Sequence, residues 1–320
     1  MQQPVTTDRE PQSVGAILMV RPACFAFNPQ TAASNAFQSA TVADAASVDA
    51  RATQELALRE FDGLAGKLAG AGVEVRIAED TVSPIKPDAL FPNNWVSFHR
   101  DGTVVLYPML APNRRLERRE EVIRTVREGG YRTSRMVDLS HRENQAKFLE
   151  GTGSLVLDRA NRVAYACLSP RTDLDVLGEF AQLLDYDLVT FEAFDAAGKP
   201  VYHTNVMMAI GARFAVVCGE AISPPTHRAA VLEKLRATAH EVIELSVAQM
   251  QCFAANLLEL APVSGSVIAL STTAWASLDR TQRRLLEGHG SVVTADIPVI
   301  ERFGGGGVRC MLAEIHLPKR

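Results

Sequence analysis

Val206-Met-Met-Ala-Ile210, Gly211-Ala-Arg213 and Phe214-Ala-Val-Val-Cys218 follow one another directly in the second half of the chain. Short apolar runs on both sides of a glycine-containing turn predict a β-hairpin. Residues 224–240, which come next, have a helical pattern, and proline is tolerated in the first turn of a helix. This stretch therefore predicts a hairpin followed by a helix.

The same order of elements recurs on both sides of this stretch, at a spacing of about 50 residues that indicates an array of similar units. We therefore expect one α/β domain with internal pseudosymmetry over residues 15–320, preceded by a mobile tail over residues 1–14. The other predicted strands are 16–21, 73–77, 95–98, 103–107, 154–157, 163–167, 256–260, 266–270 and 308–315, and the other predicted helices are 48–68, 114–128, 174–184 and 278–286.

The composition excludes several classes of protein. Of the 320 residues, 47% are hydrophobic and 22% are charged, which is typical of a globular protein, and the net charge of -4 gives no basic surface for nucleic acid. The charged run at residues 114–121 alternates in sign and predicts a helix face in contact with solvent. No stretch has the length and apolarity of a membrane span, and residues 1–14 lack the apolar core of a signal peptide.

The five cysteines are scattered and form no metal-binding spacing. We expect a cytoplasmic protein with a small-molecule substrate, without a metal or other cofactor, and without nucleic-acid or membrane partners. A homo-oligomer is compatible with the sequence.

Cys310 is the leading candidate for a reactive group. It follows four consecutive glycines, residues 304–307, and Arg309 precedes it directly. Glycines let the backbone approach a ligand closely, and a neighbouring positive charge lowers the pKa of a thiol. Taken alone, the segment fits an inert cysteine at the start of a buried strand equally well.

Further polar motifs lie at the beginnings or ends of predicted strands. Each has a simple structural explanation, because asparagines are frequent in turns and a single histidine can be a core residue. Together with Cys310 they supply a nucleophile, a base, a carboxylate, an anion-binding cation and neutral amides, as covalent catalysis by cysteine requires. These motifs are Pro87-Asp-Ala-Leu-Phe-Pro-Asn-Asn94, Glu150-Gly-Thr-Gly153, Ser169-Pro-Arg171-Thr and His203-Thr-Asn205.

The order of these motifs resembles the guanidino-group-modifying superfamily, which includes arginine deiminases, dimethylarginine hydrolases and amidinotransferases. The resemblance extends from Arg21 to Leu317. It implies the pentein fold, a five-bladed α/β propeller of ββαβ-like units with pseudo-fivefold symmetry. The strings at residues 91–95, 202–208 and 305–314 are most similar to the citrulline-utilisation hydrolases.

The resemblance also implies roles for single residues. Cys310 corresponds to the nucleophile, His203 to the general acid and base, and Glu150 to the carboxylate that pairs with that histidine or with a substrate nitrogen. Arg171 corresponds to the arginine that binds the substrate α-carboxylate, a contact that a guanidinium can make with two hydrogen bonds. The implied substrate-binding residues are Asp88, Phe91, Asn93, Asn94, Arg171, Asn205 and Arg309. The sequence leaves open whether Arg21 or Arg142 also binds the carboxylate.

The chain departs from arginine deiminases at three positions. Asn94 and Asn205 stand where those enzymes have aspartates, and Gly153 stands at an acidic position. A buried carboxylate needs a charged partner, whereas an amide can donate a hydrogen bond to a carbonyl oxygen. We therefore expect a neutral ureido substrate, namely citrulline, hydrolysed to ornithine, carbon dioxide and ammonia through a covalent intermediate on Cys310. The alternatives are arginine or dimethylarginine hydrolysis, amidino transfer, and a non-catalytic binding protein.

Overall fold

The computed structural model describes residues 10–38, 40 and 49–319, which form a mixed α/β fold. Within these residues the strands form five small sheets built on one plan. In each sheet a first and a second strand pair antiparallel. One or more helices follow, and a third strand then pairs in parallel with the second strand. The hairpin and helix predicted from the sequence are therefore present. Each unit also has a third, parallel strand, of which the sequence predicted only β2 (Glu74–Glu79) of the fifth unit, as residues 73–77.

The first three units occupy the middle of the chain. The first contains β3 (Val96–Phe98), β4 (Thr103–Leu106), α4 (Pro112–Arg115), α5 (Glu120–Glu128) and β5 (Arg135–Asp138). The second contains β6 (Leu155–Asp158), β7 (Val163–Cys167), α7 (Leu174–Leu184) and β8 (Asp187–Ala193), with β11 (Ile222–Ser223) at its edge. The third contains β9 (Met208–Ile210), β10 (Phe214–Val217), α8 (Pro225–Ala237) and β12 (Glu241–Glu244).

The remaining two units include both ends of the described chain. The fourth contains β13 (Leu258–Leu260), β14 (Val267–Ser271), α10 (Thr272–Ser277), α11 (Arg280–His289) and β15 (Ser291–Ala295), and α9 (Val247–Gln251) precedes it. The fifth contains β16 (Ala313–Glu314), β1 (Ala16–Arg21), α3 (Ala50–Gly70) and β2 (Glu74–Glu79).

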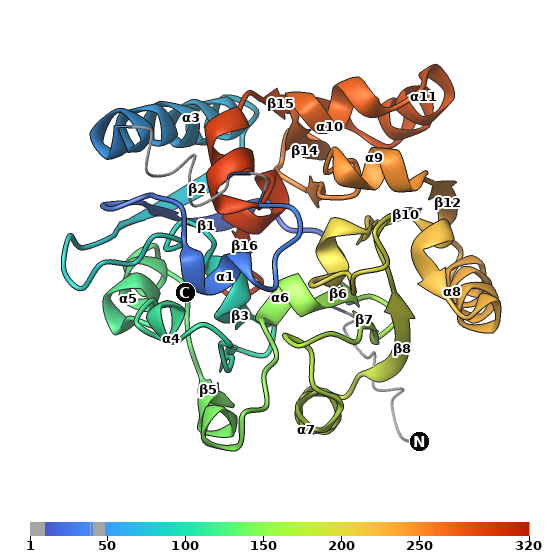
Figure 1. Cartoon of the computed structure of the whole chain (residues 1–320), viewed down its shortest axis with the longest axis horizontal. Coiled ribbons are helices and arrows are strands. Elements are labelled where there is room, and N and C mark those ends of the chain that lie inside the picture. Colours follow the sequence, from blue (N-terminus) through green and yellow to red (C-terminus); the bar gives the residue numbers. More distant parts are fainter. Residues whose placement is uncertain (1–9, 39, 41–48, 320) are drawn as a thin grey trace, which may run out of the picture.

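Helix α7 shows how the sequence places a helix against its sheet. The Asp173 side chain accepts hydrogen bonds from the backbone N–H groups of Asp175 and Val176, which is a helix N-cap. The residues of one face, among them Phe180 and Leu184, are buried against the apolar side of the second sheet. Figure 1 shows α3, α5, α7, α8 and α11 around the outside of the molecule, with the sheets towards the middle. The helices therefore cover the sheets and leave the segments between sheets to meet in the interior.

The fifth sheet joins the two ends of the chain. β1 pairs antiparallel with β16, where Ile17 lies opposite Glu314, and parallel with β2, where Ile17 lies opposite Val75. Because β16 begins three residues after Cys310, this pairing fixes the C-terminal segment that carries the candidate nucleophile.

Short helical turns precede the first strands of four sheets. These turns are η1 (Pro92–Asn94), α6 (Gly151–Ser154), η3 (Thr204–Val206) and η6 (Val308–Met311). α6 contacts both η1 and η3, and η1 contacts η6, so the turns gather in one place. The remaining short elements are α1 (Pro29–Ala32), η2 (Ser140–Gln145), η4 (Gly219–Ala221) and η5 (Ile300–Gly304).

Two predicted elements differ from the structure. The helix predicted over residues 114–128 is interrupted between α4 and α5, because Arg114 and Glu117 turn inwards and pair with each other at 2.9 Å. The predicted solvent-facing charged run was therefore wrong at these two buried residues. The strand predicted over residues 308–315 begins as the turn η6, where the Cys310 N–H donates to the Gly307 carbonyl oxygen, and only Ala313–Glu314 is strand.

The predicted mobile tail, residues 1–14, overlaps the folded part of the chain at residues 10–14. Glu10 is buried and pairs with Arg159, and Gln12 donates hydrogen bonds to the carbonyl oxygens of Leu157 and Ile210. Residues 10–14 therefore belong to the folded part, whereas residues 1–9 of the predicted tail lie outside the described residues. In the part of the chain that the structure describes, no helix has the length and apolarity needed to cross a membrane.

Candidate active site

The Cys310 sulfur lies among side-chain amides. Cys310 is 3% exposed, and its sulfur has the Asn256 Nδ2 at 3.3 Å and the Asn205 Nδ2 at 3.5 Å. Burial raises the pKa of the Cys310 thiol, and the Asn256 hydrogen bond, the charge of Arg309 and the Asn205 hydrogen bond act against this rise. Both amides can donate to the thiolate, which favours the charged nucleophile.

The glycine loop before Cys310 is closely packed. A Cβ atom added at Gly304 or Gly306 would lie 2.9 Å from the Phe91 ring, and one added at Gly307 would lie 2.6 Å from the Asn256 Oδ1. Gly305 has φ of 64°, in the left-handed region that favours glycine. The run of glycines therefore brings Phe91 and Asn256 against the backbone that leads to the nucleophile.

His203 and Glu150 form a buried pair. The His203 Nε2 lies 2.9 Å from the Glu150 Oε2. Burial lowers the pKa of His203 to about 4, despite the opposing effect of Glu150, so the imidazole is neutral near pH 7 and can accept a proton. For Glu150, burial acts to raise the pKa, but Arg171 and His203 outweigh it and hold the pKa well below its usual range. A carboxylate that orients a neutral histidine is the arrangement that general acid–base catalysis uses.

Arg171 lies beside this pair. Its Nη1 is 3.2 Å from the Glu150 Oε2, its Nη2 donates to the Thr31 carbonyl oxygen at 3.0 Å, and its guanidinium lies 4.9 Å from the centre of the Tyr202 ring. Its Nε and Nη2 also donate to the Ser34 Oγ. Arg171 is therefore at the site, where it joins the carboxylate of the pair to the segment around α1.

Asp88 and Asn94 meet a second buried arginine, Arg114. The Arg114 Nη1 donates to the Asn94 Oδ1 at 2.7 Å, and its Nε is 3.9 Å from the Asp88 Oδ2. The Asp88 Oδ2 also accepts a hydrogen bond from Asn28 at 2.7 Å, and burial raises the pKa of Asp88. The Asn94 Nδ2 donates to the Asn93 Oδ1 at 3.0 Å.

Many of these groups line one small cavity. Its free space of about 10 Å³ is close to what a single water molecule needs. The cavity brings together most of the predicted site residues with others that the sequence analysis did not name. The lining residues are Thr31, Asn35, Asp88, Phe91, Asn94, Arg114, Arg171, Tyr202, His203, Gly304, Gly305, Gly306 and Cys310.

Some predicted residues lie outside this lining. Asn205 contacts the Cys310 sulfur from the side of a neighbouring cavity, and Asn93 contacts Asn94. The Arg309 guanidinium is 2.6 Å from a Glu314 oxygen and lines that neighbouring cavity. Arg21 pairs with Asp62, and Arg142 pairs with Glu179, so neither joins the site.

Sequence reasoning missed Asn256 and Arg114. Asn256 occupies the same place in its unit as the predicted motifs, just before a first strand, and this repeat position could have identified it. Arg114 lies in a run of alternating charges, and nothing in that run separates a buried arginine from an exposed one. Within the described residues, no group of three histidine, cysteine, aspartate or glutamate side chains is arranged to hold a metal ion.

The sequence matches a family model described as N,N dimethylarginine dimethylhydrolase, eukaryotic, over residues 21–317. No curated protein gives a significant match.

Several solved structures share the fold. The N-terminal domain of ArgZ, an arginine dihydrolase from the ornithine–ammonia cycle in Cyanobacteria, was solved with bound substrate. It is 18% identical with a TM-score of 0.71, and the match covers 94% of this chain and 97% of that one. AgrE, solved with L-arginine, is 19% identical with a TM-score of 0.71, over 95% of this chain and 40% of that one.

A dimethylarginine dimethylaminohydrolase, solved as an adduct with S-methyl-L-thiocitrulline, is also similar. It is 16% identical with a TM-score of 0.64, over 94% of this chain and 99% of that one. At these identities the structural likenesses establish the fold.

Proposed function

Because the chain belongs to the family described as N,N dimethylarginine dimethylhydrolase, eukaryotic, and is a C–N hydrolase of the guanidino-modifying superfamily, we propose that it hydrolyses the guanidino group of an arginine-like amino acid. L-arginine is our first choice of substrate, since ArgZ is described as an arginine dihydrolase and AgrE was solved with L-arginine. We also propose that the five sheets are the five blades of a pentein propeller.

The observation that carries the proposal is the single cavity that Cys310 and His203 share. His203 would take the proton of the Cys310 thiol, the resulting thiolate would attack the guanidinium carbon, and His203 would pass that proton to the leaving nitrogen, which departs as ammonia. This leaves the carbon bound to sulfur. Water that has lost a proton to His203 would then attack the same carbon and break the carbon–sulfur bond, which releases citrulline. The Asn205 and Asn256 amides would stabilise the thiolate both before attack and as it leaves.

The other end of the cavity suits an amino acid. Arg114 and Arg171 are cations that can bind an α-carboxylate, and Asp88 has one buried oxygen without a hydrogen-bond partner in the described residues. That oxygen could accept from an α-ammonium group. Because the free space of about 10 Å³ is too small for an amino acid, we expect the segment around α1, which contributes Thr31 and Asn35 to the lining, to move when substrate binds.

Citrulline is the second candidate substrate, alone or as the product of the first step. The specific observation in favour of citrulline is that the side chains that donate hydrogen bonds to the Cys310 sulfur are neutral amides. Attack on the ureido carbon would release ornithine and leave a carbamoyl group on sulfur, which water would convert to carbon dioxide and ammonia. Dimethylarginine hydrolysis uses the same chemistry, with dimethylamine as the leaving group.

A substrate panel tests the proposal. The purified protein is incubated with L-arginine, L-citrulline, asymmetric dimethylarginine and agmatine, and ammonia, dimethylamine, citrulline and ornithine are quantified by mass spectrometry. We expect turnover of L-arginine that Cys310→Ser abolishes and Cys252→Ser leaves unchanged. Turnover of citrulline but not arginine would select the second candidate, and no turnover of any compound would contradict the proposed function.

A further inference from the structure

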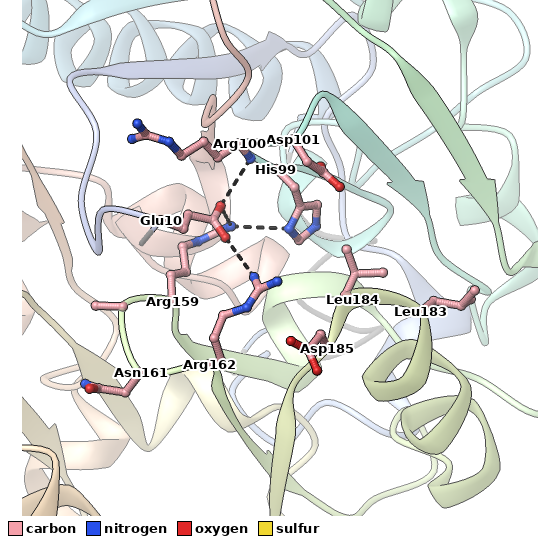
Figure 2. A pocket seen from close by; sticks show the side chains of 11 residues that line it. Glu10, His99, Arg100, Asp101, Arg159, Asn161, Arg162, Leu183, Leu184 and Asp185 are labelled. Atoms are coloured by element: carbon pink, nitrogen blue, oxygen red, sulfur yellow. Dashed lines mark hydrogen bonds and ion pairs between the residues drawn. The ribbon is translucent and has the colours of Figure 1, made fainter. Parts of the chain in front are cut away.

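A second, larger cavity lies beside hairpin turns, whereas Cys310 lies in a turn that precedes a first strand. Figure 2 shows the side chains that line this second cavity. Its volume is about 770 Å³, in the range of small-molecule sites. It lies between the β3–β4 turn, the β6–β7 turn and the end of α7, and it shares no lining residue with the Cys310 cavity. The argument for a ligand rests on six of its lining side chains, which are Glu10, Arg159, Arg162, Leu183, Leu184 and Asp185.

One wall of this cavity already holds a carboxylate. The Glu10 Oε1 accepts from the Arg159 Nη1 at 2.8 Å, and the Glu10 Oε2 accepts from the Arg162 Nη1 at 3.3 Å. Arg159 is fully buried, whereas the Arg162 side chain is 42% exposed and lies 4.7 Å from the centre of the Tyr186 ring. A guanidinium has five N–H donors, and the bond to Glu10 uses one of those on Arg162. Arg162 is therefore held in place with donors left for a second carboxylate.

The rest of the cavity supplies a negative charge and an apolar surface. Asp185 follows the last residue of α7, with φ of 57°, and its carboxylate makes no hydrogen bond or ion pair with any described residue. Leu183 and Leu184 line the cavity just before it. A cation, an anion and an apolar wall correspond to the carboxylate, ammonium and side chain of an amino acid.

We propose that this cavity binds a free α-amino acid, with its carboxylate on Arg162, its ammonium group near Asp185 and its side chain along Leu183 and Leu184. The site is separate from the proposed catalytic one but is joined to it by charged residues. Arg159 lies 4.0 Å from Glu314, and Glu314 pairs at 2.6 Å with Arg309, the residue before Cys310. The amino acid would bind at one end of this row of ion pairs.

The test uses probes that the proposed hydrolase reaction leaves intact. Wild-type full-length protein, with ¹³C-labelled leucine methyl groups, is titrated with L-ornithine, with L-glutamate and with putrescine, which lacks the carboxylate. The signals of Leu183 and Leu184 are assigned from the Leu183→Ile and Leu184→Ile variants. We expect these signals to shift saturably with both amino acids and not with putrescine.

Two arginine variants locate the contact. Arg162→Gln should weaken binding at least about tenfold, because it removes a charge-assisted hydrogen bond. Arg213→Gln is the matched control, since Arg213 is an exposed arginine in the hairpin turn of the next unit, and it should change nothing. Asp185→Asn should weaken binding without touching the Glu10 contacts.

Absence of saturable shifts in the wild type, or unchanged binding in Arg162→Gln, would overturn the proposal, and so would equal shifts with putrescine. Because the readout is the methyl signals at this cavity, it does not depend on catalysis by Cys310.

Discussion

Cys310 differs from the other buried cysteines in the groups that its sulfur meets. The Cys167 sulfur donates to the Val201 carbonyl oxygen, and burial raises its thiol pKa to about 12. Burial raises the thiol pKa of Cys218 to about 11. At Cys310 the same effect of burial is opposed by the Asn256 and Asn205 amides. Amide donors therefore separate the candidate nucleophile from cysteines that only pack.

The Asn256→Ala variant tests this assignment. Loss of a hydrogen bond to the thiolate should raise the pKa of the Cys310 thiol by about 1–2 units, from the usual strength of a hydrogen bond to a charged group. The measurement is the pH dependence of Cys310 alkylation, followed by peptide mass spectrometry. Asn161→Ala, in the β6–β7 turn, is the control. An unshifted profile for Asn256→Ala would show that this amide does not stabilise the thiolate.

The buried His203 side chain should make the free energy of unfolding depend on pH in the acid range. Burial is the main reason that its pKa is about 4 in the folded protein, whereas an exposed histidine has a pKa of about 6.5. Between these values the unfolded chain binds a proton that the folded chain does not, so folding stability falls as the pH is lowered. Urea unfolding of the wild type should therefore lose more stability from pH 6.5 to pH 4 than that of His203→Gln. Equal losses would contradict a buried neutral imidazole.

At the scale of elements, the site is built from short turns that precede first strands. These turns place Asn94, Gly153, Asn205 and Cys310, which come from four different units, around the same point. The turns tolerate little added volume. A Cβ atom at Gly153 would lie 2.5 Å from the Asn94 Nδ2 and 2.7 Å from the His203 ring. Close packing therefore accounts for the glycine at position 153. The acidic residue that arginine deiminases have there would add a negative charge as well as volume.

Gly153→Ala should displace His203 and lower the turnover number at least about tenfold, as misplaced catalytic groups do. The helical Gly178→Ala is the matched control, because an added Cβ there meets nothing within 4 Å. It should preserve activity and stabilise the protein by about 0.5–1 kcal/mol. Steady-state kinetics and chemical unfolding of both variants check this, and wild-type turnover in Gly153→Ala would count against the packing explanation.

The sequence alone was sufficient to predict the bounds of the helices and strands that have a strong local apolar pattern. Strands 16–21 and 163–167 and helix 174–184 have the predicted bounds. Apart from β2, the parallel third strands were missed because their apolar pattern is weak; in β5, for example, Arg135, Met136 and Asp138 are exposed and only Val137 is buried. Cys310, His203 and Glu150 could be predicted from their motifs because their residue types are reactive. Arg114 and Asn256 acquire their roles only through contacts between distant units, which local pattern does not contain.

At the scale of the whole molecule, the segment at residues 10–14 ties several units together. Ser13 donates to Glu259, Gln12 bonds to the backbone at Leu157 and Ile210, and Glu10 pairs with Arg159. These contacts lie at the hairpin ends away from Cys310. The last five residues of the predicted tail are therefore packed against the fold, with Glu10 buried.

Glu10→Gln should destabilise the protein by about 3–5 kcal/mol, because it removes the nearest anion from the buried Arg159. The double variant Glu10→Gln with Arg159→Met should recover part of this loss, since it removes the unpaired charge. Glu55→Gln breaks an exposed pair with Arg51 and should change the free energy of unfolding by less than about 1 kcal/mol. If Glu10→Gln unfolds like the wild type, the segment does not hold the units together.

The central claim is that Cys310 forms a covalent bond to the carbon of a guanidino amino acid. The most direct measurement is intact-protein and peptide mass spectrometry of the His203→Gln variant, quenched in acid during incubation with L-arginine, because loss of the base should slow release of the intermediate. We predict a substrate-derived adduct on the peptide that contains Cys310, and none in the variant that also carries Cys310→Ala. An adduct that persists without Cys310, or wild-type arginine hydrolysis by Cys310→Ala alone, would contradict the account.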